Sequence, residues 1–228
     1  MGEHVEFPSN GHTCRGYLGV PPTGRGPGLI VIQEWWGLVP HIEEVVDRFA
    51  DAGFVALAPD LYHGETTTEP DEAGKLMMAM NMAQAAKDMG GAVDHLVGLD
   101  AVTTSKVGVT GFCMGGGLAL MLAAQRPDAI SACVPFYGLI PWPDAHPDWS
   151  KLDASVLGHF AENDSFFSPD QARALEDQLR SHGKEVELII HPGVEHAFFN
   201  DHRPEVHDEE TSRRAFDHTV EFLRNNTG

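Results

Sequence analysis

A cysteine lies between two glycines where the sequence changes from a strand pattern to a helix pattern. The motif Gly-Phe-Cys-Met-Gly spans residues 111–115, with Cys113 at its centre and a Leu- and Ala-rich segment after it. This order is typical of a nucleophile elbow, in which a sharp strand-to-helix turn presents the nucleophile and small residues allow close packing. The start of a helix would also favour a thiolate. The alternative is a small buried cysteine with a structural role.

Two further candidates follow the cysteine in the order acid, then histidine. Asp164 comes after a predicted strand over residues 155–161, and His196 comes after a predicted strand over residues 185–191. A Cys–His pair oriented by a carboxylate can perform nucleophilic catalysis. Taken alone, Asp164 could cap a helix or a turn, and His196 could be an ordinary loop histidine. Their order and their positions after strands favour a triad with Cys113.

A fourth candidate segment, Gln-Glu-Trp-Trp-Gly at residues 33–37, ends the first predicted parallel strand. In α/β-hydrolase sheets this loop supplies one backbone N–H of the oxyanion hole, here assigned to Trp35, and Met114 supplies the other. Glu34 is unusual beside a nucleophilic cysteine, because a nearby carboxylate opposes thiolate formation. The alternative for Glu34 is an exposed loop residue.

The elements that must position these residues alternate between strand and helix along the chain. Short apolar runs predict buried strands, and periodic apolar positions predict helices that cover them. A hairpin is expected over residues 4–20, strands over 28–33, 54–58, 106–110, 129–136, 155–161 and 185–191, and helices over 41–52, 77–99, 113–125, 169–182 and 211–225. The segment 77–99 is expected to form two helices around Gly90-Gly91, and residues 140–149 a loop that is either a lid or a partner contact. The pattern predicts a single α/β domain over residues 1–228, with a mostly parallel, doubly wound sheet and helices on both faces.

Composition limits the function classes. The chain has 228 residues, 34 Asp and Glu against 15 Lys and Arg, and a formal net charge of −19. Such a balance disfavours nucleic acid and anionic membranes as partners. No signal-peptide pattern or membrane-length apolar run is seen, so we expect a cytoplasmic protein, monomeric or weakly homodimeric, with reduced cysteines. The 13 histidines form no familiar metal-binding motif, and no metal or cofactor is expected.

The motifs together resemble the dienelactone hydrolase family of α/β-hydrolases, the carboxymethylenebutenolidase-like enzymes. The resemblance rests on the segments 33–37, 58–62, 111–116 and 137–138, the Asp164 loop and the segment 196–198. It implies the α/β-hydrolase fold, a Cys113–His196–Asp164 triad and no cofactor. It also implies a role for Glu34, which would hold the resting thiol neutral and release it as a thiolate when substrate arrives.

The match to that family breaks where its members hold a substrate carboxylate. They use two arginines, one before the elbow and one four residues after the histidine. Here residues 64–100 contain no arginine and position 200 is Asn, so Arg203 is the nearest cation to His196. Arg203 is therefore a candidate substrate-binding residue, together with the aromatic residues Trp36, Tyr137 and Phe198.

The sequence thus predicts a cysteine-dependent hydrolase of lactones or small carboxylic esters that acts through an acyl-enzyme. The alternative is a general carboxylesterase or thioesterase acting on neutral small esters, which the missing arginines favour. A catalytically silent binding protein on the same fold is less favoured, because all three triad residues are present.

Overall fold

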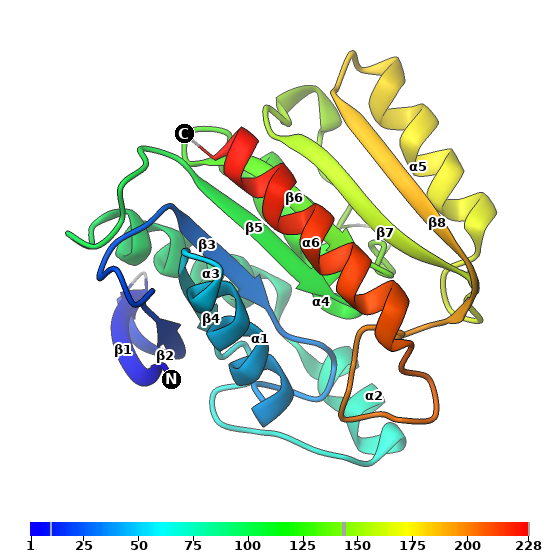
Figure 1. Cartoon of the computed structure of the whole chain (residues 1–228). Coiled ribbons are helices and arrows are strands. Elements are labelled where there is room, and N and C mark those ends of the chain that lie inside the picture. Colours follow the sequence, from blue (N-terminus) through cyan, green and yellow to red (C-terminus); the bar gives the residue numbers. More distant parts are fainter. Residues whose placement is uncertain (10, 143–144, 228) are drawn as a thin grey trace.

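An eight-stranded sheet runs through the molecule (Figure 1). The computed structural model describes residues 1–9, 11–142 and 145–227. The strand order is β1-β2-β4-β3-β5-β6-β7-β8; β1 and β2 form an antiparallel hairpin, β2 pairs antiparallel with β4, and the other pairs are parallel. The strands are β1 (Glu3–Ser9), β2 (His12–Gly19), β3 (Gly28–Ile32), β4 (Val55–Pro59), β5 (Val107–Phe112), β6 (Ile130–Phe136), β7 (Ser155–Asn163) and β8 (Val186–Glu195).

Helices cover both faces of this sheet. Helices α1 (Pro40–Asp51) and α6 (Glu209–Asn226) lie in front of it in Figure 1, and Phe49 and Leu223 contribute to the apolar layer beneath them. On the other face lie α3 (Met82–Val97), α4 (Met114–Gln125) and α5 (Pro169–Ser181) over a second layer. Every residue of β3, β4 and β5 is buried, which explains their largely apolar sequences. The exception, Thr110 in β5, donates its hydroxyl hydrogen to the Val134 carbonyl at 2.8 Å. The predicted doubly wound α/β fold is confirmed.

The segment before β5 differs from the prediction. Its two helices are α2 (Pro70–Ala79) and α3, and they separate at Met80 and Asn81 rather than at Gly90-Gly91. The Asn81 side chain accepts a hydrogen bond from the Gln84 amide at 3.1 Å, which caps α3. Gly91 lies inside α3, where a methyl group would come within 3.0 Å of the backbone of Pro8 and Ser9. The glycine thus serves a close approach between α3 and β1, and the predicted helix break there was wrong.

The loop predicted over residues 140–149 is described except at positions 143 and 144, which lie outside the described residues. It leads into the short 3₁₀ helix η2 (Trp149–Lys151), and the Trp149 side chain is buried against the α4 side of the core. Its near end reaches the candidate site described below, because Pro141 contributes to the wall of the cavity there.

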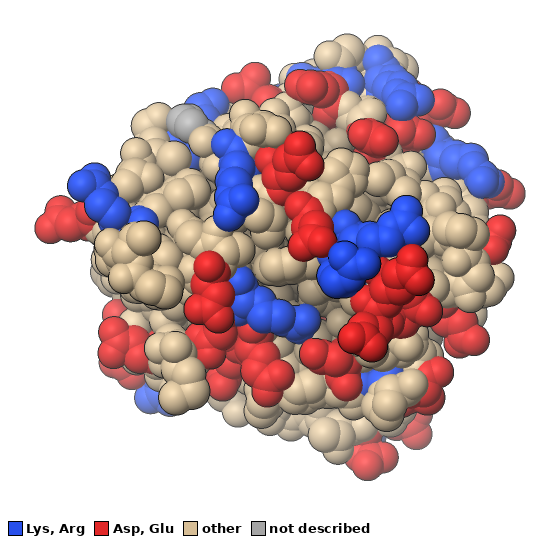
Figure 2. Space-filling view, in the orientation of Figure 1, with Lys and Arg blue, Asp and Glu red and all other residues tan. Residues whose placement is uncertain are grey.

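Charge on the surface follows the acidic composition. On the face drawn in Figure 2, acidic side chains are widespread and the basic ones lie among them. The described part of that face therefore offers no broad basic surface of the kind that binds nucleic acid. Among the described helices, none has both the length and the apolar composition needed to cross a membrane.

Candidate active site

The candidate residues meet where the parallel strands end. Strand β3 lies between β4 and β5, so the chain order reverses beside it, and crevices in open α/β sheets form at such a point. Glu34 follows β3 and Cys113 follows β5. Asp164 and His196 come directly after β7 and β8, which lie farther along the same edge. The fold thus brings residues as far apart in sequence as Glu34 and His196 to one end of the sheet.

The turn at Cys113 has the geometry of a nucleophile elbow. Cys113 has φ 55° and ψ −119°, a positive φ that a non-glycine residue adopts only under strain, and it immediately precedes α4. A methyl group at Gly111 would collide with the carbonyl of Gly115, and one at Gly115 would come within 2.5 Å of the carbonyls of Ile32 and Gln33. The two glycines are therefore required by packing. They hold the cysteine at the crevice, where its side chain is partly exposed.

Asp164 both contacts His196 and caps the turn that follows it. Its Oδ2 lies 2.8 Å from His196 Nδ1, and its Oδ1 accepts hydrogen bonds from the amides of Phe166 and Phe167 at 2.8 and 2.9 Å. The carboxylate is fully buried. The turn bonds fix the carboxylate in place, and the fixed carboxylate in turn orients the imidazole with Nδ1 as donor.

His196 is charged across the neutral range when the neighbouring sulfur is a thiolate. Burial lowers the pKa of His196, but hydrogen bonds to Asp164 and Cys113, together with the negative charges of both, outweigh burial and raise it to about 10. An imidazolium at this position stabilises a thiolate and can also donate a proton to a leaving oxygen.

Glu34 is buried beside this group, contrary to the exposed-loop alternative. Its side chain is 1% exposed, and its Oε2 accepts a hydrogen bond from Asn200 Nδ2 at 2.7 Å. Burial raises the pKa of Glu34 above the usual value, although the positive charge of His196 and the bond from Asn200 oppose that rise. The protonated form of Glu34 carries no charge and does not oppose a thiolate, whereas the ionised form does.

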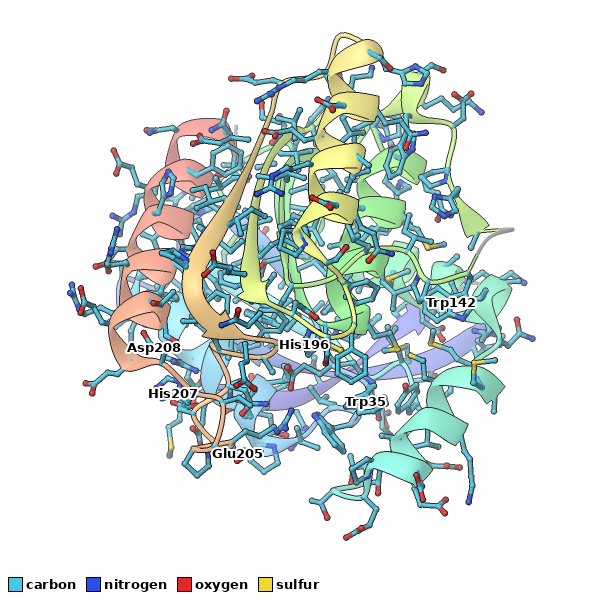
Figure 3. The ribbon with its side chains drawn as sticks, turned by 90° about the vertical axis from the view of Figure 1, so that its right-hand side faces the viewer. Trp35, Trp142, His196, Glu205, His207 and Asp208 are labelled. Atoms are coloured by element: carbon cyan, nitrogen blue, oxygen red, sulfur yellow. The ribbon has the colours of Figure 1, made fainter. Side chains whose placement is uncertain are left out.

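A cavity of about 380 Å³ opens over the cysteine. Cys113, His196, Glu34, Trp35 and Met114 all contribute to its wall, and Figure 3 shows Trp35 near His196 at this end of the molecule. Met114 is the first residue of α4, so its N–H belongs to the helix turn that has no partner within the helix. Both residues assigned to the oxyanion hole therefore adjoin the nucleophile, in a mostly apolar cavity.

Comparisons with known proteins agree with this geometry. A model of the dienelactone hydrolase family matches residues 14–227. The chain belongs to the dienelactone hydrolase family. It is a hydrolase that acts on lactone or ester bonds.

Two relatives and one solved structure show how far the similarity extends. The chain is 41% identical to Protein usf of Aquifex pyrophilus and 36% identical to a protein of Aquifex aeolicus named "Putative carboxymethylenebutenolidase", covering 98% of both chains in each case. It superimposes with a TM-score of 0.87 on a dienelactone hydrolase-like promiscuous phosphotriesterase from metagenomic libraries, at 23% identity over 100% of this chain and 99% of the other. The last match concerns the fold alone.

The four residues proposed to bind substrate in this family member divide into two pairs. Trp36 and Arg203 line the cavity, with the Arg203 guanidinium 5.9 Å from the centre of the Trp36 ring and its Nε 2.9 Å from Glu205. Tyr137 and Phe198 are fully buried and do not line the cavity.

Tyr137 and Phe198 instead support the histidine from behind. The Tyr137 ring lies 5.1 Å from the His196 ring and 5.3 Å from the Phe198 ring, in edge-to-face contacts. Their positions next to motif residues predicted proximity to the site but not direction, because neighbouring side chains in a loop point to different sides. These two aromatic residues pack behind His196 and do not reach the wall of the cavity.

Other side chains of the cavity wall were not singled out from the sequence. They are Pro70, Met77, Pro141, Phe166 and Phe167. The position of Phe166 and Phe167 two and three residues after Asp164 is a signal that could have found them. No sequence pattern points to Met77, and only the placement of α2 over the site shows that it reaches the cavity.

The remaining cysteines are inert by comparison with Cys113. Cys14 and Cys133 are buried, and burial raises the pKa of Cys14 to about 12 and that of Cys133 still higher. Both thiols therefore stay protonated at neutral pH. Cys113 is the partly exposed thiol of the three that the chain contains.

Proposed function

We propose that the protein hydrolyses lactones or small carboxylic esters with Cys113 as nucleophile and His196 and Asp164 as its partners. The observation that carries this proposal is the His196–Asp164 contact of 2.8 Å at the wall of the cavity into which the strained Cys113 turn projects. A histidine oriented by a buried carboxylate beside a partly exposed thiol is the arrangement that thiol-based acyl transfer requires.

In the first half of the reaction, the Cys113 thiolate attacks the carbonyl carbon and a C–S bond forms. The carbonyl electron pair moves to the oxygen, which the N–H groups of Trp35 and Met114 stabilise. The tetrahedral intermediate then collapses: the C–O bond breaks, and the leaving oxygen takes a proton from His196 Nε2. The product of this half is a thioester, with His196 neutral.

In the second half, neutral His196 accepts a proton from water as the water oxygen attacks the thioester carbon. The new tetrahedral intermediate collapses with cleavage of the C–S bond, so the carboxylic acid leaves and the thiolate–imidazolium pair returns. Asp164 keeps its negative charge throughout the reaction and stabilises His196 whenever the imidazole is protonated.

Glu34 is proposed to restrain the thiol before substrate binds. Its buried carboxyl lies at the same cavity wall as Cys113, so an ionised Glu34 and a thiolate oppose each other, and burial makes Glu34 the group that takes up a proton. Thiolate formation is thus coupled to protonation of Glu34. A restrained thiol is less easily oxidised in the absence of substrate.

Arg203 is proposed to attract a substrate carboxylate in place of the two missing arginines. It is the basic side chain on the described wall of the active-site cavity, and it pairs with Glu205 there. An arginine can bind a carboxylate through two parallel hydrogen bonds. The mostly apolar wall supports the second candidate, a carboxylesterase or thioesterase for neutral small esters, since a neutral substrate needs no cation.

The deciding experiment compares the turnover of a dienelactone with that of a neutral p-nitrophenyl ester, in the wild type and in Cys113→Ala. We expect both activities to be lost in the variant. Lactone turnover in the wild type would support the family substrate, and ester turnover alone would support the neutral-ester candidate. Activity that survives in Cys113→Ala would refute the nucleophile, and a wild type that turns over neither substrate would favour the silent binding protein.

A separate experiment tests Glu34. The rate of Cys113 alkylation by iodoacetamide is measured in the wild type and in Glu34→Gln, which keeps the shape of the side chain but cannot ionise. We expect faster labelling in Glu34→Gln. Unchanged or slower labelling would contradict the restraint.

A further inference from the structure

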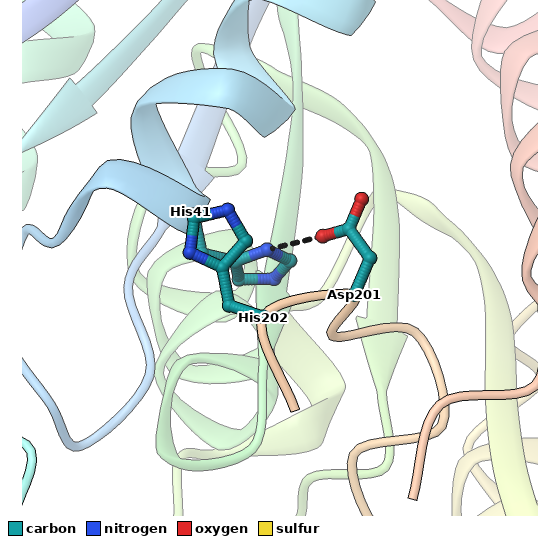
Figure 4. A group of neighbouring side chains, drawn as sticks. All are labelled: His41, Asp201 and His202. Atoms are coloured by element: carbon teal, nitrogen blue, oxygen red, sulfur yellow. Dashed lines mark hydrogen bonds and ion pairs between the residues drawn. The ribbon is translucent and has the colours of Figure 1, made fainter. Parts of the chain in front are cut away.

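A second histidine–carboxylate group lies beside the active site, on residues that the proposed reaction does not use. His41 comes from the first turn of α1, and Asp201 and His202 come from the loop after β8 (Figure 4). Glu44, also on α1, contacts His202. One ring nitrogen of His41, one of His202 and one carboxylate oxygen of Asp201 lie within 4.8 Å of one another. Because the contributing segments are 160 positions apart, no sequence motif announces the group.

The spacing of these atoms suits a shared metal ion. His41 Nδ1 lies 3.1 Å from Asp201 Oδ1, and His202 Nε2 lies 3.0 Å from Glu44 Oε2. Two ligand atoms about 2.1 Å from one ion are separated by roughly 3.0–3.4 Å when the bonds meet at angles between those of an octahedron and a tetrahedron. Both contacts therefore have the distance expected between two neighbouring ligand atoms of one ion, which is also the distance of a hydrogen bond.

His41 is not fully used by the fold. Its side chain is 1% exposed, and its Nε2 has no hydrogen-bond partner among the described residues. Buried polar atoms are almost always paired, so a buried imidazole with an unpaired nitrogen is unusual. The nitrogen that would be offered to an ion is Nδ1, which faces Asp201 Oδ1.

The group also faces open space. His41 and His202 contribute to the wall of a cavity of about 730 Å³, together with Thr66, Thr67 and Thr68. This cavity shares Trp36 and Arg203 with the active-site cavity. An ion held here would have room for a water molecule as a further ligand.

We propose that His41, Asp201 and His202 form a binding site for a divalent transition-metal ion such as Zn²⁺, and that Glu44, which contacts His202, turns in as a fourth ligand when the ion binds. Two imidazoles with carboxylates are a ligand set that Zn²⁺ accepts. Arg48 lies 3.7 Å from Asp201 Oδ2, so Asp201 pairs with Arg48 through one oxygen and offers Oδ1 to the ion. His202 and Glu44 are exposed and can turn toward the ion without disturbing the core.

A bound ion would link α1 to the loop after β8, which borders the active-site cavity. The same loop carries Asn200, which holds Glu34, and Arg203, whose amide donates to the Asn200 carbonyl at 3.0 Å. The proposal does not depend on the hydrolase mechanism, since binding is measured without turnover.

The test uses protein stripped with a chelator and carrying Cys113→Ser, so that the active-site thiolate cannot compete for the ion. Zn²⁺ binding is measured by calorimetry, Co²⁺ binding by its visible absorption, and the melting temperature with and without Zn²⁺. We expect one ion per chain, a Co²⁺ spectrum of low coordination number and a higher melting temperature. His202→Ala and Asp201→Asn, both at exposed side chains, should each weaken binding by about 100-fold.

His182→Ala removes an exposed histidine at the end of α5 and serves as the control that should bind as the parent does. Failure of the parent protein to bind either ion would overturn the proposal. So would binding that is equally strong in His202→Ala and Asp201→Asn, because it would come from other histidines. A uniform loss of binding in all three variants would likewise contradict a site at these residues.

Discussion

Two buried histidines, each with a carboxylate at its Nδ1, behave in opposite ways. His196 lies 2.8 Å from Asp164, and His41 lies 3.1 Å from Asp201, which follows His196 by only five residues. The pKa of His196 is raised to about 10, whereas that of His41 is lowered to about 4. Almost the same hydrogen bond therefore accompanies a charged imidazole in one place and a neutral one in the other.

The surrounding charges explain the difference. Burial lowers the pKa of both rings, but His196 has Asp164 beside it and gains a second negative neighbour whenever Cys113 is ionised. For His41, the positive charge of Arg48 offsets part of the effect of Asp201, and His202 adds to this when it is protonated. Asp201 is 40% exposed, whereas Asp164 is fully buried, so water also screens the Asp201 charge more strongly. A carboxylate contact alone does not make a histidine a catalytic acid; the sum of the charges around it does.

The largest expected difference between the two histidines is in activity. His196→Gln should lower kcat/KM by about 1,000-fold or more, because it removes the proton donor and the partner of the thiolate. His41→Gln should leave kcat/KM near the wild-type value, since its ring lies outside the active-site cavity. Steady-state kinetics in buffer with a chelator measure both. A loss of kcat/KM in His41→Gln similar to that in His196→Gln would contradict the prediction that only His196 takes part in the reaction.

Replacing Asp164 should change the pH dependence of the reaction, whereas replacing Asp201 should not. His196 donates a proton below its pKa, so activity should fall as the pH rises through about 10. Asp164→Asn removes a charge that holds this pKa up. Its kcat/KM should drop by about 100-fold or more, and its alkaline limb should move to lower pH.

Asp201→Asn is the matched control and should keep the alkaline limb of the wild type. Profiles of kcat/KM against pH for the wild type, Asp164→Asn and Asp201→Asn measure this difference. An Asp164→Asn profile with an unmoved alkaline limb would mean that the limb belongs to another group.

The sequence predicted that the residues around His196 lie close together, but it did not predict the group around His41. Cys113, Asp164 and His196 each follow a buried strand, and the ends of parallel strands meet at one edge, so their proximity follows from the strand pattern. His41 and Asp201 meet only because α1 packs beside the loop after β8, and neither residue belongs to a motif. Proximity of that kind depends on tertiary packing.

The directions in which side chains point could not be predicted from the sequence either. Tyr137 and Phe198 are close to the candidate site in sequence, yet their side chains pack into the buried core behind His196 and do not line the cavity. Gly91 shows that packing can also override the conformational preference of the backbone. The tendency of glycine to break helices was visible in the sequence, whereas the close approach of Gly91 to β1 was not.

The two histidines should also contribute to stability with opposite pH dependence. For His41 the folded pKa, about 4, lies below the unfolded value of 6.5, so the unfolded chain binds more protons between them and stability falls as the pH falls. His196 has a raised folded pKa, so its stabilisation is present below the unfolded value and is lost as the pH rises through about 10.

Urea unfolding at pH 7 and pH 5 measures the His41 contribution. The decrease in the free energy of unfolding between these pH values should be smaller in His41→Gln than in the wild type by about 2 kcal/mol. His182→Gln, a change at an exposed position, is the control. An equal decrease in the wild type and His41→Gln would show that His41 does not carry this acid sensitivity.

The smallest expected effect concerns the cation beside His41. Arg48 lies 3.7 Å from Asp201 and 5.0 Å from the centre of the Phe199 ring, so Arg48→Met removes the charge while keeping an apolar stem over that ring. The pKa of His41 should then rise from about 4 by about one pH unit, because one positive neighbour is gone and Asp201 acts on His41 unopposed by it. An NMR titration of the imidazole measures the change. If the His41 pKa stays near 4 in Arg48→Met, burial alone sets it, and the contrast with His196 then rests on the Cys113 thiolate rather than on the cations around Asp201.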